Sequence, residues 1–402
     1  MLPATAAFAF SDVSSSYWDY TAITYVATNR NWMRDYGTST FKPGTAEIRK
    51  YLARALVRAF VPTETPDTSI TFPDLPSTDS FYKYAAITTK HGWLATDASG
   101  NFRPTANVIV RDTDRALTRA LNLDAVLQGL ANVHQASGTT YTLPSYFPHV
   151  QLAHALGLHY NHSTESMDVQ QSTPMRRDEV AYSLWKAKTL TSSKLSSMSR
   201  FQNVSLPTLD PTNATQAAKQ KLTKYALSQV GSPYIWGGEW NKVSPSGYCC
   251  GYQPQGGFDC SGFIWWVMKR YEDGYNSAQF RSYAGWSIHQ RTSSTMAQNT
   301  TTKLGWTRLQ IGDLMFFASN GRKTYSDVDH VGFYLGNGWM AHSASSNDGP
   351  ALQWVGTATS NATSPTWYFT KFVWGRRLIG VAATTTSIQS MTASQLKAGD
   401  SR

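Results

Sequence analysis

A cysteine at the start of an apolar helix constrains this chain more than any other feature of its sequence. The seven residues from Gly257 to Phe263 lead into Cys260 through a turn, and after Gly262 no glycine or proline occurs before Tyr271. This pattern predicts a buried helix that begins at the cysteine, with Asp259 as its N-cap. A thiol in the first turn feels the positive end of the helix dipole, which lowers its pKa. Cys260 is therefore a candidate nucleophile, and a buried, inert cysteine is the alternative.

Two histidines flank one predicted β-hairpin downstream of this cysteine. Residues 329–336 alternate in polarity like a strand, an Asn-Gly pair follows, and residues 339–343 form the returning strand. A cysteine nucleophile needs a base to take its proton and a third group to orient that base. Cys260, His330 and His342 can supply all three roles.

The length of the hairpin loop decides whether the two histidines can meet. A two-residue loop would set His342 opposite Phe333, on the wrong face for His330. A three-residue loop with its last glycine in the left-handed region would set His342 opposite Gly332, diagonal to His330. We therefore expect an odd-numbered loop, a hydrogen bond between the two histidines, and His330 facing Cys260.

Four motifs in this region resemble those of the NlpC-type, papain-like cell-wall cysteine endopeptidases. The likeness covers roughly residues 216–379, and the motifs occupy Pro233–Gly238, Phe258–Gly262, Gly312–Phe317 and His330–Gly336. The resemblance implies an α+β papain-like catalytic domain, with a helix-borne cysteine packed on an antiparallel sheet. It also implies hydrolysis of stem peptides in bacterial peptidoglycan, often between D-glutamate and a diamino acid.

The resemblance assigns roles to individual residues. Cys260 would be the nucleophile, His330 the base and His342 the residue that orients the base, while Tyr234, Asp259 and Ser261 would border the substrate groove. It implies no cofactor. An amidase or acyltransferase of the same fold, or a wall-binding protein without catalytic activity, are the alternatives.

The cysteine count bears on metal and redox chemistry. The chain has three cysteines, and the adjacent pair Cys249-Cys250 has neither the spacing of a zinc site nor that of a thioredoxin-like redox site. We therefore expect no metal, and we expect Cys260 to remain free whether or not the other two pair.

Charge is distributed unevenly along the chain. Residues 1–190 hold 17 Lys/Arg against 16 Asp/Glu, whereas residues 215–380 hold 15 against 8. No nucleic-acid-binding motif or basic run accompanies this excess. An anionic cell wall is therefore a better partner than nucleic acid, and a generically basic surface is the alternative.

The N-terminal half contains an internal repeat. The pattern that begins at Phe10 and continues through Phe41 and a helix to Phe60 recurs from Phe72 through Phe102, 62 residues further on. A weaker third copy runs from residue 147 to 181. Each copy reads as helix, loop and helix and cannot bury its apolar face alone, so we expect the three to pack around a shared core.

These units resemble S-layer-homology repeats, which anchor proteins to polymers attached to peptidoglycan. The likeness covers residues 10–188, and the family's Thr-Arg-Ala-Glu signature survives only in part. The polymer-binding arginines that the resemblance implies are Arg49, Arg111 and Arg177. A purely structural role for this module is the alternative.

These observations predict a secreted, cell-wall-associated protein of several domains, because 402 residues exceed what one core usually holds. No stretch approaches the roughly 20 apolar residues of a membrane-spanning helix. The small residues at positions 4–6 resemble a signal-peptidase site without a basic region before it, which suggests a trimmed or misassigned secretory start. The expected boundaries are repeats at 1–62, 63–125 and 126–190, a linker at 191–214, the catalytic domain at 215–380 and a disordered tail at 381–402.

Overall fold

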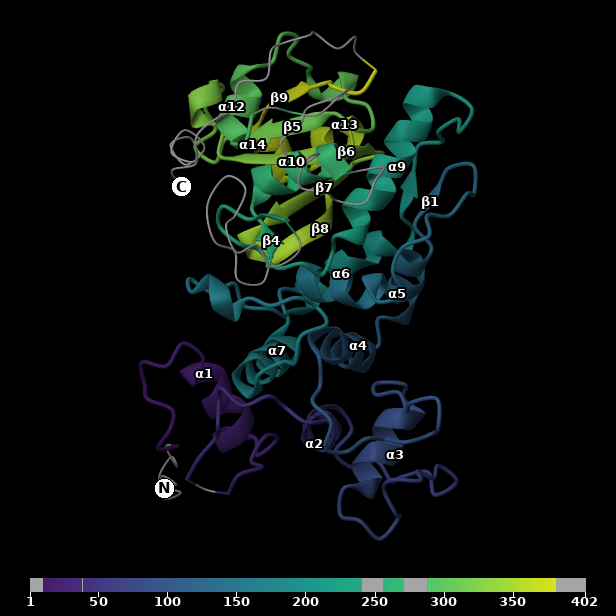
Figure 1. The fold of residues 1–402 in the computed structure, drawn as a ribbon, viewed down its shortest axis with the longest axis vertical. Helices are drawn as coiled ribbons and strands as arrows, with labels where there is room; N and C mark the ends of the chain where they lie inside the picture. The colour runs from purple at the N-terminus through teal and green to yellow at the C-terminus, as the bar shows by residue number, and fades with distance from the viewer. Residues whose placement is uncertain (1–9, 38, 241–255, 271–287, 289, 381–402) are drawn as a thin grey trace. The chain divides into compact units, whose positions relative to one another are not determined.

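The computed structural model describes residues 10–37, 39–240, 256–270, 288 and 290–380, which form two compact units (Figure 1). The first unit comprises the residues up to Leu127 together with Leu152–Tyr160 and Gln171–Ser199. The second comprises Gln128–Gln151, Asn161–Gln170 and the residues from Arg200 onward. The chain thus passes between the two units several times.

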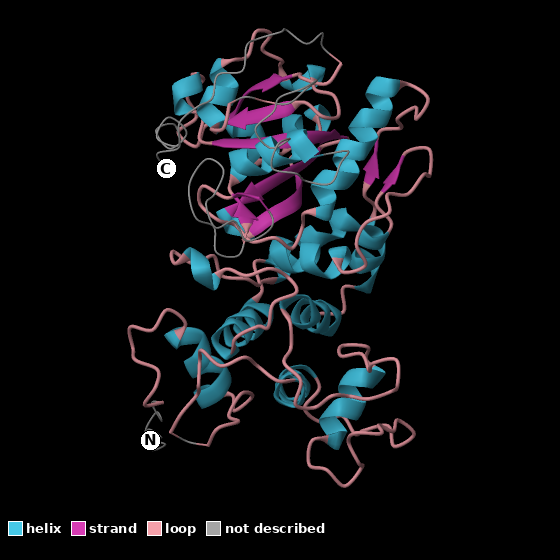
Figure 2. Ribbon diagram, viewed as in Figure 1, coloured by secondary structure: helices cyan, strands magenta, loops and turns pink. Residues whose placement is uncertain are grey.

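Helices joined by loops make up the first unit (Figure 2). Its elements are α1 (Tyr20–Ile23), the π-helix η1 (Thr24–Asn29), α2 (Arg49–Phe60), α3 (Tyr82–Lys90), α4 (Val110–Ala120), α7 (Arg177–Thr189) and α8 (Ser192–Ser197). In α2 the buried residues Leu52, Ala53 and Leu56 recur at the three- and four-residue spacing of one helical face. Helix α2 therefore ends at Phe60, as expected from the sequence.

Three segments of the first unit meet in a closed ring of backbone hydrogen bonds. The N–H of Glu47 donates to the carbonyl of Met175, Met175 donates to Val108, and Val108 donates to Glu47, each at 2.9 Å. Each of these residues lies two positions before the first residue of a helix, namely α2, α4 or α7. The three helices therefore begin around one common centre.

The expected third repeat is not a single body. Residues 128–151 and 161–170 belong to the second unit, which also contains α5 (Asp124–Ala131) and α6 (Phe147–Leu156) in part. The side chain of Gln151 both donates to the carbonyl of Leu352 (2.9 Å) and accepts from its N–H (2.7 Å). Because this buried amide pairs with a strand 201 residues away, local patterns in the sequence could not indicate it.

Residues 191–214 were expected to form a linker but contain regular elements. Helix α8 is followed by the 3₁₀-helix η3 (Met198–Gln202) and by β2 (Ser205–Leu206), which pairs in parallel with β1 (His134–Gln135). Strand β1 comes from the segment expected to be the third repeat. Backbone pairing, which composition does not reveal, thus orders part of the expected linker.

A five-stranded antiparallel sheet forms the centre of the second unit, in the order β8-β7-β6-β5-β9. Its strands are β5 (Leu314–Phe317), β6 (His330–Gly336), β7 (Trp339–Ala344), β8 (Gly349–Trp354) and β9 (Phe372–Arg376). The shorter pair β3 (Glu239–Trp240) and β4 (Gly257–Phe258) is also antiparallel. The expected antiparallel sheet is therefore present.

Helices pack on this sheet and complete the α+β unit. Helix α10 (Cys260–Arg270) contacts β6 and β7, and α9 (Ala214–Ser228) packs beside it. Helix α9 begins at Ala214, because the side chain of Asn213 caps it by accepting from the N–H of Gln216. The remaining elements are η2 (Glu165–Met167), α12 (Ser293–Gln298), η4 (Trp306–Arg308), η5 (Tyr325–Asp327), η6 (Ser345–Asn347), α13 (Ala358–Thr363) and α14 (Trp367–Lys371).

Within the described part of the chain, no helix has both the length and the apolar character needed to cross a membrane. Cys249, Cys250 and the C-terminal tail lie outside the described residues.

Candidate active site

Cys260 is the first residue of α10, as the sequence predicts. Asp259 caps the helix, because its carboxylate accepts a hydrogen bond from the N–H of Gly262 at 2.5 Å. Cys260 is 6% exposed, and its thiol donates a weak hydrogen bond to the carbonyl of Asp329, with 3.9 Å between sulfur and oxygen. Asp329 directly precedes His330, so the thiol lies at the start of β6.

The helix start depends on a glycine. A Cβ added to Gly262 would lie 1.8 Å from the carbonyl oxygen of Gly238 and 2.8 Å from a nitrogen of Arg291. Only a residue without a side chain lets the backbone at Gly238 approach the first turn of α10 this closely.

The hairpin between β6 and β7 has the register that brings the histidines together. Phe333 pairs with Ala341 and Tyr334 with Met340, and a bulge at Leu335 precedes the turn. This extra residue shifts the register by one position, which sets His342 opposite Gly332. The structure therefore reaches the expected register with a two-residue loop plus a bulge.

The expected hydrogen bond between the histidines is present. Nε2 of His330 and Nδ1 of His342 lie 2.8 Å apart, and the two rings meet edge to face. Burial lowers the pKa of His330 to about 4 and holds the pKa of His342 well below its ordinary value. Both imidazoles are therefore neutral at neutral pH, and a neutral ring can accept a proton from a thiol.

Asn347 extends this chain of hydrogen bonds. Its side-chain Nδ2 donates to Nε2 of His342 at 3.1 Å. The sequence analysis missed this residue, which lies in η6 only five positions after His342. The only sequence signal for it was the polar run that follows β7, before Asp348 takes a left-handed backbone conformation.

A buried arginine, Arg291, binds residues at the start of α10. Arg291 donates to the carboxylates of Asp259 (2.9 and 3.0 Å) and Glu239 (3.0 Å), to the hydroxyl of Ser261 (2.8 Å) and to the carbonyl of Gly238 (3.1 Å). The side chains of this network are almost completely buried. Nothing in the local sequence around Arg291 indicated the network, because its partners lie 30 to 53 residues away.

The residues expected to border the substrate groove have different surroundings. Asp259 and Ser261 are buried and bonded to Arg291. Tyr234 is partly exposed, and its N–H donates to the carbonyl of Asp348 at 3.2 Å. Tyr234 also bridges to Phe258, so it lies beside the turn that leads into Cys260.

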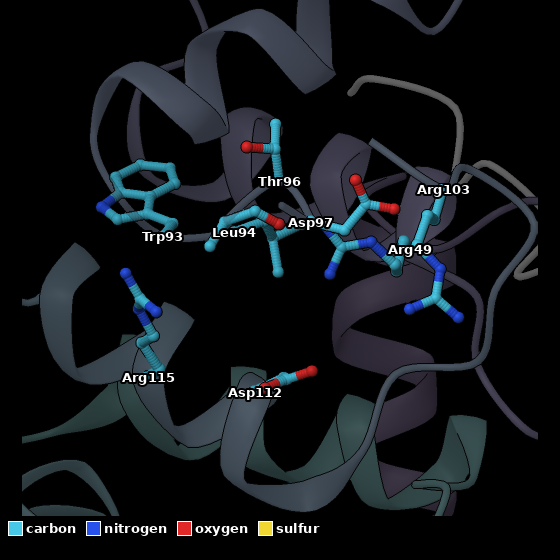
Figure 3. Close-up of a pocket in the computed structure, with 9 residues that line it drawn as sticks. Arg49, Trp93, Leu94, Thr96, Asp97, Arg103, Asp112 and Arg115 are labelled. Atoms are coloured by element: carbon cyan, nitrogen blue, oxygen red, sulfur yellow. Dashed lines mark hydrogen bonds between the residues drawn. The ribbon is translucent and has the colours of Figure 1, made fainter. Parts of the chain in front are cut away.

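The three arginines expected to bind a wall polymer also differ in their surroundings. Arg49 lines a cavity in the first unit (Figure 3), whereas Arg177 is fully buried and paired with Asp35 and Glu47. Arg111 donates to the side chain of Gln171 at 3.2 Å. Among the described residues, no group of three or more His, Cys, Asp or Glu side chains is arranged to hold a metal ion.

The stretch of the chain that contains this site matches a known protein family. Residues 231–368 match the NlpC/P60 family, and this range includes Cys260, His330 and His342. Residues 231–368 therefore have the papain-like α+β fold of NlpC/P60 domains.

Curated relatives match over a similar range. The chain is 33% identical to murein DD-endopeptidase MepH of Escherichia coli over 33% of its own length and 40% of that protein. It is 32% identical to the probable peptidoglycan endopeptidase LytE of Bacillus subtilis over 31% and 27%, respectively. The matched stretch thus spans well under half of each relative. A solved NlpC/P60 family structure from Bacillus cereus is 25% identical, with coverage of 40% of each chain and a TM-score of 0.28.

Proposed function

We propose that this protein is a cysteine peptidase that hydrolyses stem-peptide bonds of bacterial peptidoglycan. The observation that carries the proposal is Cys260 at the start of α10, beside the strand that bears His330, with His342 hydrogen-bonded behind that histidine. The match to NlpC/P60 domains and to named peptidoglycan endopeptidases supports the substrate class. We further propose the bond between D-glutamate and a diamino acid, and a secreted, wall-associated location.

The proposed mechanism is acyl transfer. The Cys260 thiolate attacks the peptide carbonyl carbon and forms a thioester, while the peptide nitrogen leaves as an amine after it takes the proton that His330 removed from the thiol. Backbone N–H groups at the start of α10 stabilise the negative charge on the carbonyl oxygen in the tetrahedral intermediate. Water then hydrolyses the thioester and regenerates the thiol.

The hydrogen-bond chain fixes the tautomer that this mechanism needs. If Nε2–H of His330 donates to Nδ1 of His342, Nδ1 of His330 stays free to accept the thiol proton. Nε2–H of His342 then needs an acceptor, and Asn347 supplies its amide oxygen when its side-chain amide turns by half a rotation. Asn347 thus acts as a positioning residue through His342.

Digestion of purified peptidoglycan, followed by mass spectrometry of the products, tests the proposal. The wild type should release stem-peptide fragments with a new amino terminus on the diamino acid, and Cys260→Ala should release none while it keeps its fold. Release of intact stem peptides from the glycan would indicate an amidase instead. Binding to peptidoglycan without any cleavage by the wild type would favour the non-catalytic alternative.

We also propose that the first unit attaches the protein to anionic wall polymers. The support is the sequence resemblance to S-layer-homology repeats and the position of Arg49 at a cavity. Sedimentation of the full chain with cell walls tests this role, since Arg49→Ala should reduce the bound fraction. Arg322→Ala serves as the control, because Arg322 is an exposed arginine of the second unit.

A further inference from the structure

A tyrosine of helix α14 packs against the proposed catalytic histidines. The ring of Tyr368 meets the ring of His342 edge to face, with 5.6 Å between their centroids. It also meets Phe317 at 5.4 Å, and Phe317 in turn lies 5.9 Å from the ring of His330. His342 and Phe317 are fully buried, whereas His330 and Tyr368 are partly exposed. Tyr368 therefore lies beside the histidine pair and is open to solvent on part of its surface.

Helix α14 is held firmly in the second unit (Figure 1). The hydroxyl of Thr366 accepts from the N–H of Phe369 at 3.2 Å and donates to the carbonyl of Val355 at 2.6 Å. The ring of Trp306 meets Phe369 at 5.0 Å and Phe372 at 5.1 Å. A helix that is capped at its start and packed by aromatic rings presents its outward side chains in a fixed geometry, as a binding site requires.

The hydroxyl of Tyr368 is available to a bound molecule. It forms no hydrogen bond within the part of the chain that the structure describes. A tyrosine whose ring is largely packed normally finds a partner for its hydroxyl. Burial raises the pKa of Tyr368, so the hydroxyl keeps its proton and can donate it to an acceptor. Beside it, the ring of Trp367 is 47% exposed and meets Tyr368 at 5.1 Å.

Two lysines lie next to this tyrosine. Lys371 follows Tyr368 by three positions, so the two side chains lie on one face of α14. Its ammonium group lies over Gly321 in the loop between β5 and β6 (residues 318–329), because a Cβ on that glycine would be 3.6 Å from Nζ. Lys323 of the same loop donates from its ammonium group to the carbonyl of Phe372. The helix and the loop therefore bring two positive charges together.

These two charges are not neutralised within the described residues. Burial and the nearby charge of Lys371 lower the pKa of Lys323. Neither ammonium group forms an ion pair in the described ranges of the chain. Like charges at close range raise the free energy of the folded state, and an anion bound between them lowers it.

The acidic residues of the β5–β6 loop serve other groups. Asp327 accepts from the side-chain amide of Asn320 at 2.7 Å and faces the guanidinium of Arg322 at 3.7 Å. The carboxylate of Asp329 accepts from the N–H of Ser319 at 3.0 Å. The loop thus uses its own carboxylates to fix its shape and leaves the two lysines for an acid from outside the chain.

The proposed reaction brings the leaving half of the substrate to this side of the thiol. In that mechanism the leaving amine takes its proton from His330, so the peptide attached to the amine extends past this histidine. Tyr368 contacts the partner of that histidine, and Lys371 lies one helical turn beyond Tyr368. A substrate that passes His330 therefore meets the tyrosine first and the lysines next.

We propose that Tyr368, Lys371 and Lys323 form a subsite that binds a carboxylate on the leaving half of the peptide substrate. The hydroxyl and the ammonium groups donate charge-assisted hydrogen bonds to the carboxylate oxygens. The exposed ring of Trp367 offers an apolar surface to the aliphatic part of the same residue. The inference rests on the proposed peptidase function, and it makes stem peptides with a free carboxylate after the cleaved bond the preferred substrates.

Two pairs of synthetic stem peptides test the subsite in the full-length protein. One pair is L-Ala-γ-D-Glu-L-Lys and the other carries a further D-Ala, and each peptide is made as the free acid and as the C-terminal amide. In at least one pair the wild type should have a KM about tenfold lower for the acid, because a hydrogen bond to a charged group contributes roughly that factor.

Variants of the subsite should remove this preference by different amounts. Lys371→Met should abolish it, Lys371→Arg should keep most of it, and Tyr368→Phe, which retains the ring beside His342, should reduce it about fivefold. Lys224→Met is the matched control, because Lys224 is an exposed lysine of α9 in the same unit. The control should keep the full preference, which excludes a general attraction between the acid and a basic surface.

Equal KM values for acid and amide in both pairs would overturn the inference, as would an acid preference that survives Lys371→Met. Calorimetric titration of Cys260→Ala with the same peptides separates the subsite from the proposed function. If the wild type cleaves none of the peptides, yet Cys260→Ala binds the acid of one pair about tenfold more tightly and the added Lys371→Met removes that difference, the function fails and the subsite stands. Cleavage without an acid preference keeps the function and rejects the subsite, and neither cleavage nor binding rejects both.

Discussion

Gly332→Ala should displace the proposed catalytic histidines although neither histidine is substituted. A Cβ at position 332 would lie 2.4 Å from Sδ and 2.8 Å from Cγ of Met340, and 3.1 Å from Cβ of His342. Ordinary contacts to a Cβ begin near 3.4 Å. Met340 or the strand that carries it must therefore move by about 1 Å.

The core around Met340 resists that movement. Met340 is fully buried and packs with Met315, Phe317, Val355 and Phe372. Extra volume in a well-packed core typically costs about 1–3 kcal/mol of folding free energy. A shift of β7 also lengthens the bond between His330 and His342, and a misplacement of about 1 Å in a catalytic group can cost roughly 100-fold in rate.

Urea unfolding and peptidase kinetics together check this reasoning. Gly332→Ala should lower the free energy of unfolding by about 1–3 kcal/mol and lower kcat more than it raises KM. Gly305→Ala is the matched control, because a Cβ there meets nothing within 4 Å and the backbone φ of −73° suits alanine. In a Met340→Ala background the added methyl group should cost less, since the clashing atoms are gone. Unchanged stability and kcat in Gly332→Ala would refute the argument.

Three further predictions follow from the site. Arg291→Met removes the cation that pairs with the buried carboxylates of Glu239 and Asp259, so the free energy of unfolding should fall by about 3–5 kcal/mol in thermal and urea unfolding. The surface variant Arg322→Ala should lose far less, and a loss below about 1 kcal/mol in Arg291→Met would contradict the buried network. Asn347→Ala should lower kcat/KM roughly fivefold, because the net worth of one such hydrogen bond is about 1 kcal/mol. Asn347→Asp, which can only accept, should keep most of the activity, and equal losses in both variants would argue against the positioning role. Because the pKa of His330 is lowered to about 4, kcat/KM should hold between pH 7 and 5, and an acid limb near pH 6.5 would be inconsistent with a neutral, buried base.

The same shift at His330 makes folding stability depend on pH. The unfolded chain binds a proton at the ordinary histidine pKa of 6.5, whereas the folded chain binds it only near 4. The unfolded state therefore holds more protons in this window, and stability should fall as the pH drops from 6.5 toward 4, by up to about 3 kcal/mol. His330→Gln should flatten this dependence in urea unfolding measured across that range.

Local sequence patterns predicted the elements that depend on interactions between residues close together in the sequence. The cysteine at the helix start follows from an apolar run with a capping aspartate before it, and the meeting of the two histidines follows from strand alternation and loop geometry. The loop has two residues instead of the expected three, and the bulge at Leu335 provides the register shift. Such predictions succeed because each depends on residues only a few positions apart.

Features that depend on distant partners could not be predicted in this way. Arg291 joins Glu239 and Asp259, which lie 52 and 32 residues away in the sequence, and no spacing in the sequence marks it as a buried cation. Arg111 looked like the counterpart of Arg49 because it is the arginine nearest the expected position. Only the backbone hydrogen bonds showed that Val110 has that place in the fold.

The repeated passage of the chain between the two units has consequences for how the protein folds during synthesis. The ring that joins Glu47 and Val108 cannot close until Met175 has left the ribosome, and by then residues 128–151 are exposed without the sheet to which Gln151 will bond. That bond waits for Leu352, so a large part of the chain must emerge before either unit is complete. Slow folding of the second unit is therefore expected, and removal of residues 1–190 would take structural parts away from that unit.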